Sequence, residues 1–431
     1  MKFVVLTQYF YPEVGATQTR LDAVCRELTR AGHKVEVVTA MPHHPAGRIA
    51  PAYRGRFYCR ETRNSVAIHR VWLYAGNGAG WKRILNYLSF TLTSLFGLVR
   101  AGRPDYLFVD SPPLTIALSA WAASSWWNRP LIFNVADLWP DSARDLGVLN
   151  EGMVFRAAGF LERWIYRRSA RITAVTEGIR TALLQKKNVP EEKVMFLPNG
   201  VDTRLIAPVP PDEELRRQLG LARKRVVLYA GNHGYAGALD QILDAAKVLE
   251  HHERIHFLLI GDGPQKADLK NRAREMGLAN ITFLDPVPLH ELPKIIALAE
   301  CAVVTLRRAK VMRGARPAKA LVMMAAAKPV VLAAEGEAAD LVTQAAAGFV
   351  VPPENPAALA RAIRTMLSDP VAAHSMGANG RSFIQSHLEW SVLVRNWLSQ
   401  LAGAHSPSVA VSDQTESEKS HDRVPGVRAA V

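Results

Sequence analysis

Two glycine-rich loops in the second half of the chain have the composition of a phosphate-binding site. The first, GNHGYAG at residues 231–237, directly follows the apolar run VVLYA. The second, GDGP at residues 261–264, ends the next expected strand in the same way. Small residues at a strand end let a diphosphate approach the amides that open a helix. A tight turn explains the first loop nearly as well, and its spacing is GxxGxxG, not the GxGxxG of dinucleotide oxidoreductases.

Basic residues gather after a later strand, just before and into the helix-forming segment ALVMMAAA. They are Arg307, Arg308, Lys310, Arg313, Arg316 and Lys319. A run of this kind is usually a solvated surface. Because this one follows a strand end, Arg313 or Lys319 is placed to neutralise a diphosphate through charge-assisted hydrogen bonds.

Two loops in the first half also follow expected strands. The segment YFYPEVGAT at residues 9–17 contains Gly15, which permits close approach of a ligand to the backbone, and the amides of the next helix suit an anion. A loop packed by its aromatic residues, with a glycine chosen for its turn, is an equal alternative. Asp137 follows the strand LIFNVA, and a carboxylate at a strand end is well placed to act on a substrate. The neighbouring Trp139 and Pro140 more often fix a loop.

The elements that must position these loops alternate β-rich runs with segments of helical period, which predicts βαβ units and parallel sheets. The expected strands of the first half are Lys2–Thr7, Lys34–Thr39, Val66–Val71, Asp105–Val109, Pro130–Val135, Arg171–Val175 and Val194–Leu197. Those of the second half are Val226–Ala230, His256–Ile260, Ile281–Leu284, Ala302–Leu306, Pro329–Ala333 and Gly348–Val351. We therefore expect an α/β protein with two doubly wound, Rossmann-like domains. The proline-rich stretch at residues 198–212 is expected to separate them.

Composition excludes several classes of protein. The chain has 431 residues, of which 49% are hydrophobic, so it is neither disordered nor a disulfide scaffold. Three separated cysteines without a CxxC encode no zinc cluster. The motifs HExxH, GxSxG, Walker A and DxD are missing, so metalloprotease, α/β-hydrolase and P-loop NTPase functions lack support. Residues 405–431 are polar and predicted to be disordered.

The net charge of +14 is concentrated in the first 100 residues, which hold 14 basic and 5 acidic side chains. This charge lies beside the uncharged segment Ile84–Val99 and the residues Trp121, Trp126 and Trp127, a combination that favours an anionic membrane surface as partner over nucleic acid. Polar residues interrupt Ile84–Val99, which is shorter than the roughly 20 residues of a membrane span. The N-terminus lacks the pattern of a signal peptide. We expect a cytoplasmic protein that associates peripherally with the inner membrane face.

Segments spread over most of the chain resemble family 4 retaining glycosyltransferases, which have the two-domain GT-B fold. The resemblance is strongest to the bacterial branch that builds capsule, O-antigen and exopolysaccharide, and it extends from Met1 to about Leu401. Each segment is weak alone, but their order and spacing are specific. They are TQYFYPEVGATQTR, AGHKVEVVTAMPHHPAG, ADLWPDSARDLG, TAVTEGIR, FLPNGVD, YAGNHG, LLIGDGPQKADL and RPAKALVMMAAAKPVVLAAEGEAADLV.

The resemblance implies a hexosyltransferase with its acceptor on an N-terminal domain, residues 1–203, and its nucleotide-diphosphate sugar on a C-terminal domain, residues 204–382. Residues 383–402 are then expected to cross back onto the first domain. Transfer to a glycan acceptor, lipid-linked in this branch, retains configuration and uses neither a metal nor another cofactor. The fixed cations and amide dipoles of such a site stabilise the charge that develops on the leaving nucleotide.

The resemblance also implies roles for particular residues. The expected catalytic residues are Asp137, Lys319 and Arg313. The expected acceptor-binding residues are Glu13, Gly15 and Arg20. The expected donor-binding residues in the glycine loops are Gly231, Asn232, His233, Gly234, Gly261 and Asp262.

Two positions depart from the family pattern. Many members carry paired glutamates eight residues apart, where this chain has Gly314 and Val322, and the residue before Asp137 is Ala136 instead of His or Arg. Donor binding then falls to other groups, such as Glu335 or Glu337. The departures keep two alternatives open. One is a UDP-sugar 2-epimerase of the same fold, and the other is a catalytically silent binding protein of a polysaccharide-assembly complex.

Overall fold

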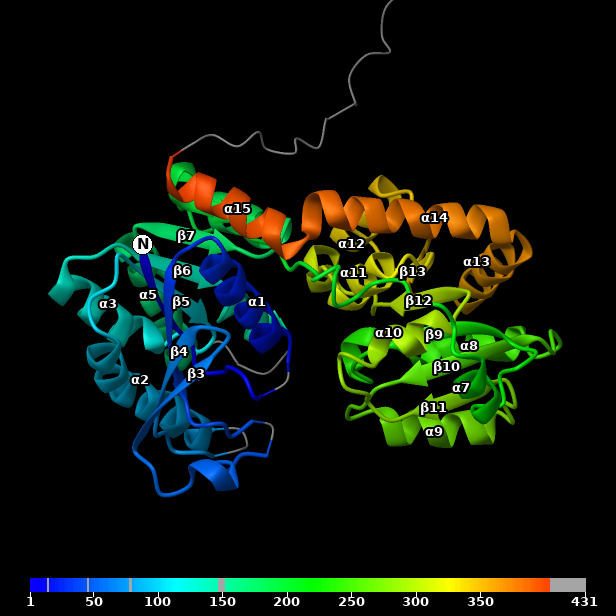
Figure 1. The fold of residues 1–431 in the computed structure, drawn as a ribbon, viewed down its shortest axis with the longest axis horizontal. Coiled ribbons are helices and arrows are strands. Elements are labelled where there is room, and N and C mark those ends of the chain that lie inside the picture. Colours follow the sequence, from blue (N-terminus) through cyan, green and yellow to red (C-terminus); the bar gives the residue numbers. More distant parts are fainter. Residues whose placement is uncertain (14, 45, 77–79, 146–151, 404–431) are drawn as a thin grey trace, which may run out of the picture.

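The computed structural model describes residues 1–13, 15–44, 46–76, 80–145 and 152–403. It contains two separate sheets, each flanked by helices and placed side by side (Figure 1). The predicted α/β architecture with two doubly wound sheets is confirmed. The tail at residues 405–431, predicted to be disordered, lies outside the described residues.

The first sheet has eight strands in the order β3-β4-β2-β1-β5-β6-β7-β8. They are β1 (Lys2–Leu6), β2 (Lys34–Ala40), β3 (Tyr58–Arg63), β4 (Val66–Val71), β5 (Tyr106–Ser111), β6 (Leu131–Val135), β7 (Arg171–Ala174) and β8 (Val194–Phe196). All pairs are parallel except the edge pair β3 and β4. The sequence did not predict β3, because its segment YCRETR is half-exposed and lacks the apolar run of a buried strand.

Helices cover both faces of the first sheet. They are α1 (Ala16–Arg30), α2 (Trp81–Ala101), α3 (Ile116–Trp127), α4 (Asp141–Asp145), α5 (Met153–Arg168) and α6 (Glu177–Gln185). The helices α2 and α3 pack on one face, while α1 packs on the other beside α15 (Trp390–Leu401), the last helix of the described residues. The Trp397 indole of α15 donates a hydrogen bond of 3.1 Å to Thr173 Oγ1 and contacts the rings of Phe3 and Phe108. Helix α15 therefore completes the core of the first sheet (Figure 1).

The second sheet is parallel throughout, in the order β11-β10-β9-β12-β13-β14. Its strands are β9 (Arg225–Ala230), β10 (Ile255–Ile260), β11 (Ile281–Leu284), β12 (Cys301–Thr305), β13 (Val330–Ala333) and β14 (Gly348–Val351). Its helices are α7 (Glu213–Gln218), α8 (Asp240–Val248), α9 (Lys266–Glu275), α10 (Leu292–Ala297), α11 (Ala318–Ala325), α12 (Glu337–Gln344), α13 (Pro356–Ser368) and α14 (Pro370–Phe383). This is the Rossmann strand order, and the order reverses between β9 and β12. Ligands of such sheets bind outside the carboxyl ends of the strands at this reversal.

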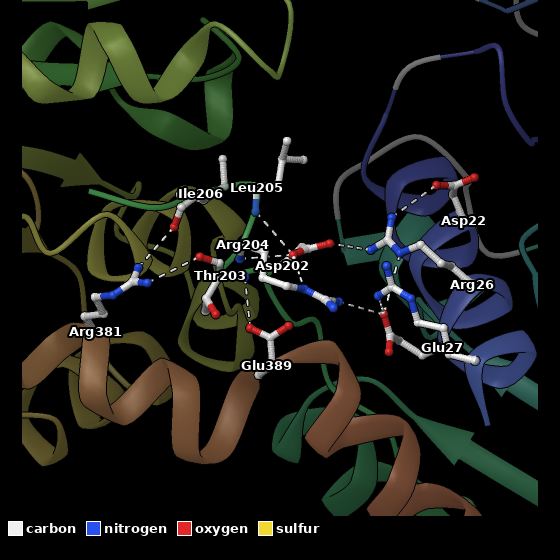
Figure 2. A network of polar contacts seen from close by, with 11 residues as sticks. Asp22, Arg26, Glu27, Asp202, Thr203, Arg204, Leu205, Ile206, Arg381 and Glu389 are labelled. Carbon is white, nitrogen blue, oxygen red and sulfur yellow. Dashed lines mark hydrogen bonds and ion pairs between the residues drawn. The ribbon is translucent and has the colours of Figure 1, made fainter. Parts of the chain in front are cut away.

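The chain passes between the two sheets twice, and the two crossings are bonded to each other (Figure 2). Val201 of the first crossing forms a β-bridge with Glu389 of the second, and Glu389 Oε2 accepts a hydrogen bond of 2.9 Å from the Thr203 amide. Asp202 forms an ion pair of 2.8 Å with Arg26 of α1. The crossings are therefore fixed to each other and to the first sheet's own helix.

Candidate functional site

Lys319 lies in the first turn of α11, beside the point where the strand order of the second sheet reverses. Its Nζ donates a hydrogen bond of 2.8 Å to the hydroxyl of Tyr229 on β9, and that hydroxyl donates one of 2.8 Å to the carbonyl of Asn232. Burial alone lowers the pKa of Lys319 to about 8, and among the described residues no carboxylate pairs with it. An ammonium group without a counter-charge thus lies against the first glycine loop, as an anion site requires.

The two glycine loops pack backbone against backbone. A Cβ placed on Gly261 would lie 1.9 Å from the carbonyl oxygen of Gly231, and one on Gly263 would lie 2.4 Å from Asn232 Oδ1. Both glycines have φ values that L side chains rarely adopt, +143° and +156°. At Gly231 a Cβ would lie 3.6 Å from Lys319 Cε. Because these glycines carry no side chain, the two loops can pack against each other beside Lys319.

The predicted donor residues of these loops differ in where their side chains lie. His233 is fully buried, and in the described part of the chain neither of its ring nitrogens has a hydrogen-bond partner. Burial lowers the pKa of His233 to about 4, so the ring is neutral. Asp262 is exposed, and its Oδ1 accepts a hydrogen bond from the Gly263 amide. The side chain of Asn232 lies close to Gly234, because a Cβ placed on Gly234 would be 2.9 Å from Asn232 Nδ2.

Glu337 makes its contacts across the two domains. Its carboxylate accepts hydrogen bonds of 3.2 Å from the amides of Glu177 and Gly178, which open α6 of the first domain. It also pairs with Arg316 at 2.8 Å. Directly beside this contact, a Cβ on Gly178 would lie 3.0 Å from Cα of Gly314. The structure thus places Glu337 in a contact that holds the rims of the two domains together.

The other residues near this rim that the sequence singled out do not take part in the hydrogen bonds between Lys319, Tyr229 and Asn232. Arg313 Nε lies 3.7 Å from Glu335 Oε2, and both side chains are exposed, at 66% and 43%. Val322, which occupies a position of the family's paired glutamates, packs against the apolar core. The backbone of Gly314 occupies the other position and supplies no side chain.

Replacing Glu337 with alanine is expected to lower the free energy of unfolding by about 2 kcal/mol, because the change leaves the Arg316 side chain, only 10% exposed, without its carboxylate partner. The lost contacts to α6 are expected to increase the radius of gyration as well. Urea unfolding and small-angle X-ray scattering measure the two effects. Glu335→Ala is the matched control, since its partner is exposed and loosely paired. Equal effects of the two changes would contradict the interdomain role of Glu337.

On the first domain, Glu13 joins the loop after β1 to the loop after β2. Its Oε1 accepts hydrogen bonds of 2.8 Å from the amides of both His43 and His44. Gly15 precedes α1, where a Cβ would lie 2.5 Å from Gln18 Oε1. Glu13 also lines a groove of about 400 Å³ at this edge of the sheet.

Arg20 and Asp137 lie in contrasting environments. Arg20 is 5% exposed and forms an ion pair with Asp110, a fully buried carboxylate that also accepts a hydrogen bond of 2.6 Å from Asn134. Burial raises the pKa of Asp110 in spite of this pairing. Asp137 is exposed directly after β6. The structure therefore brings Lys319 and the glycine loops together, while Glu13, Arg20 and Asp137 occupy separate positions on the first domain.

Sequence reasoning missed three groups that shape the site. Tyr229 lies inside a strand run and gave no signal beyond its polar hydroxyl. Lys266 supports the second glycine loop by donating a hydrogen bond of 2.7 Å to the Gly261 carbonyl and one of 2.6 Å to Asp285. Arg316 was part of the basic run, but its pairing with Glu337 depends on a contact that no local pattern records.

Comparison with known proteins gives matches over most of the chain. Residues 15–200 match the family model "Glycosyl transferase 4-like domain", and residues 211–383 match "Glycosyl transferases group 1". Both models describe glycosyltransferases and together they span most of the chain, which is a glycosyltransferase with a group 1 domain at residues 211–383. The two matches divide this glycosyltransferase near the proline-rich stretch between its two sheets.

Relatives and solved structures extend the comparison. The glycosyltransferase is 26% identical over 415 residues to the putative colanic acid biosynthesis glycosyl transferase WcaI of Escherichia coli, covering 94% of this chain and all of WcaI. HepE of Anabaena, solved with UDP-glucose, matches with a TM-score of 0.69 at 18% identity, over 94% and 100% of the two chains. An E. coli structure titled trehalose-6-phosphate, bound with UDP-2-fluoro glucose, matches with a TM-score of 0.69 at 14% identity, over 94% and 99%. The structural matches confirm the GT-B fold.

Proposed function

We propose that this glycosyltransferase is a family 4 hexosyltransferase that transfers a sugar, with retention, from a nucleotide-diphosphate donor to a lipid-linked glycan acceptor in cell-surface polysaccharide synthesis. The donor diphosphate binds beside Lys319 and the glycine loops. The observation that carries this proposal is the unpaired ammonium of Lys319, held against the first loop by Tyr229. As the glycosidic bond breaks, the departing diphosphate gains negative charge, which a fixed cation in a dry site stabilises.

The names of similar proteins support the proposed classes of donor and acceptor. WcaI is named for colanic acid biosynthesis, and HepE was solved with UDP-glucose. In this chain, the donor then lies on the second domain and the acceptor on the first. Asp137 and the groove beside Glu13 are the acceptor-side groups that the first domain presents.

Transfer is tested by incubating the protein with a panel of nucleotide sugars and polyprenyl-diphosphate sugar acceptors. Mass spectrometry detects the product, and NMR coupling constants report the anomeric configuration. We expect transfer with retention that persists in EDTA, since the sequence has no DxD and the described residues hold no group of three or more metal-ligating side chains. The absence of both sugar transfer and nucleotide binding would overturn the proposal.

A catalytically silent binding protein is the second candidate, favoured by one observation. The positions of the family's paired glutamates hold Gly314 and Val322, so neither carboxylate is present. Nucleotide-sugar binding with no turnover of any acceptor would support this candidate over the transferase.

We also propose that the first domain attaches to an anionic membrane surface at the cytoplasmic face. Among the described residues, α2 is the helix whose length and composition suit a membrane span, but one side of it packs on the sheet. Its other side is exposed and carries apolar residues that recur at helical spacing. They are Trp81, Ile84, Leu85, Leu88, Leu92 and Val99. Exposed Lys82 and Arg100 lie at the two ends of this side. An amphipathic helix with flanking cations binds in the interface of an anionic bilayer.

The double change Leu88→Asp and Leu92→Asp is expected to reduce co-sedimentation with anionic liposomes by about tenfold or more, because two apolar groups no longer enter the interface. Val248→Asp, at an exposed apolar residue on α8 of the second domain, is the matched control. Binding that is no stronger to anionic than to neutral liposomes would refute the electrostatic part of the proposal.

A further inference from the structure

A groove opens at the carboxyl ends of β1 and β2, on the acceptor side of the first domain. Its volume of about 400 Å³ lies in the range of pockets that hold a small ligand. Apolar side chains make up much of its wall, among them Pro12, Pro42, Ile49 and Pro51. The groove is thus suited to a ligand with a substantial apolar part.

Two arginines, Arg48 and Arg54, give this groove a positive charge. Both line it and both are exposed. In the described part of the chain neither forms an ion pair with a carboxylate, and Arg54 Nε donates a hydrogen bond of 3.1 Å to the Ile49 carbonyl. Glu13, the carboxylate in the wall, already accepts two backbone hydrogen bonds on its Oε1. Guanidinium groups without a carboxylate partner are the side chains best suited to bind phosphate.

The loop that forms one wall of the groove also contacts α2 near its first turns. The ring of Tyr9 stacks on His43, a residue of the groove wall, with centroids 5.5 Å apart. The neighbouring Gln8 donates a hydrogen bond of 2.7 Å to Asn86 of α2. The loop after β1 therefore lies between the groove and the first turns of α2, where Trp81 and Ile84 are exposed.

We propose that Arg48 and Arg54 bind the phosphate groups of the acceptor, and that this acceptor is an isoprenoid-type lipid diphosphate whose hydrocarbon chain extends from the groove toward α2. The proposal rests on the proposed function, of which it specifies the acceptor and its binding residues. The positive charge of the two arginines favours binding of phosphate groups. The apolar wall of the groove favours a ligand with a lipid chain over a free anion.

Binding is measured first, with geranyl diphosphate, geraniol and inorganic pyrophosphate as probes in isothermal titration calorimetry. We expect geranyl diphosphate to bind tightest, and the double variant Arg48→Ala, Arg54→Ala to weaken its binding by about 10-fold to 100-fold. Arg56→Ala is the matched control, because Arg56 is exposed in the same loop outside the groove. In a Lys319→Ala background the double variant is expected to weaken binding by the same factor, which separates the groove from the donor loops.

Several results would overturn the proposal. Unchanged binding of geranyl diphosphate in the double variant would do so, as would an equal loss in Arg56→Ala. Pyrophosphate that binds as tightly as geranyl diphosphate would indicate a site for free phosphate instead of a lipid. The exposed positions of both arginines allow the variants to fold, and an unchanged melting temperature checks this.

A transfer assay separates this proposal from the proposed function. We expect the double variant to raise KM for a lipid-diphosphate sugar acceptor at least about tenfold, while KM for the donor stays unchanged. If transfer proceeds and the double variant behaves as the unmodified protein, the groove proposal fails and the transferase function stands. If geranyl diphosphate binds in the groove but no sugar is transferred, the transferase function fails and the binding site stands.

Discussion

Replacing Lys319 with alanine is expected to reduce kcat/KM for the nucleotide sugar by about 10²–10³-fold, a loss typical of removing one preorganised charge-stabilising group. The reason is that its ammonium lies beside the glycine loops, held by Tyr229, and no carboxylate among the described residues neutralises it. Steady-state kinetics with the donor varied measures the effect.

Lys310→Ala is the matched control for this change. Lys310 belongs to the same basic run but is exposed, so its loss is expected to alter kcat/KM less than about twofold. Equal losses in the two variants would mean that the basic run acts through its total charge, and this would contradict a specific role for Lys319.

The pH dependence of kcat/KM follows from the same residue. Burial lowers the pKa of Lys319 to about 8, so in the free enzyme its side chain is a cation below this pH and neutral above it. Donor binding needs the cation, so kcat/KM is expected to fall as the pH rises through about 8. In Lys319→Arg the guanidinium stays charged, so this decline is expected to disappear. A decline that persists in Lys319→Arg would assign it to another group.

Gly261→Ala is expected to have the second large effect, a loss of more than about 3 kcal/mol in the free energy of unfolding together with loss of donor binding. The added Cβ would lie 1.9 Å from the Gly231 carbonyl oxygen, at a φ of +143° that alanine disfavours. One of the two glycine loops must therefore move away from the other. Thermal unfolding and nucleotide-sugar titration measure the two losses.

Gly277→Ala separates the clash from the backbone strain. Gly277 also has a positive φ, +64°, but nothing lies within 4 Å of a Cβ placed there. Its replacement is expected to cost only about 1–2 kcal/mol and to leave donor binding unchanged. If Gly277→Ala destabilised the protein as much as Gly261→Ala, the packing of the two loops would not be the cause.

Local patterns in the sequence predicted the elements well where one face of an element is apolar. The strand predicted at Val66–Val71 is β4 with the same bounds, because its apolar, β-branched residues are typical of a buried strand. The strand β3 was missed, since an antiparallel edge strand with exposed polar residues gives no such pattern.

Side-chain environment was less predictable. Glu337 was expected to bind the donor, yet its carboxylate contacts α6, whose first residue lies 160 positions away in sequence. Arg20 was expected on the acceptor surface, and its guanidinium lies in a buried ion pair with Asp110. Both contacts join elements distant in sequence, and a local pattern does not record which distant group fills a position.

By itself, the sequence determined that this protein has two doubly wound α/β domains with glycine loops and a basic run at strand ends, because hydrophobic period and glycine spacing are local properties. The tertiary structure decided which of the basic residues lies at the loops. Among six in the run, Lys319 is held by Tyr229, while Arg316 is engaged by Glu337. That selection depends on burial and on partners supplied by other strands and helices, so only the folded chain determines which cation lies against the glycine loops.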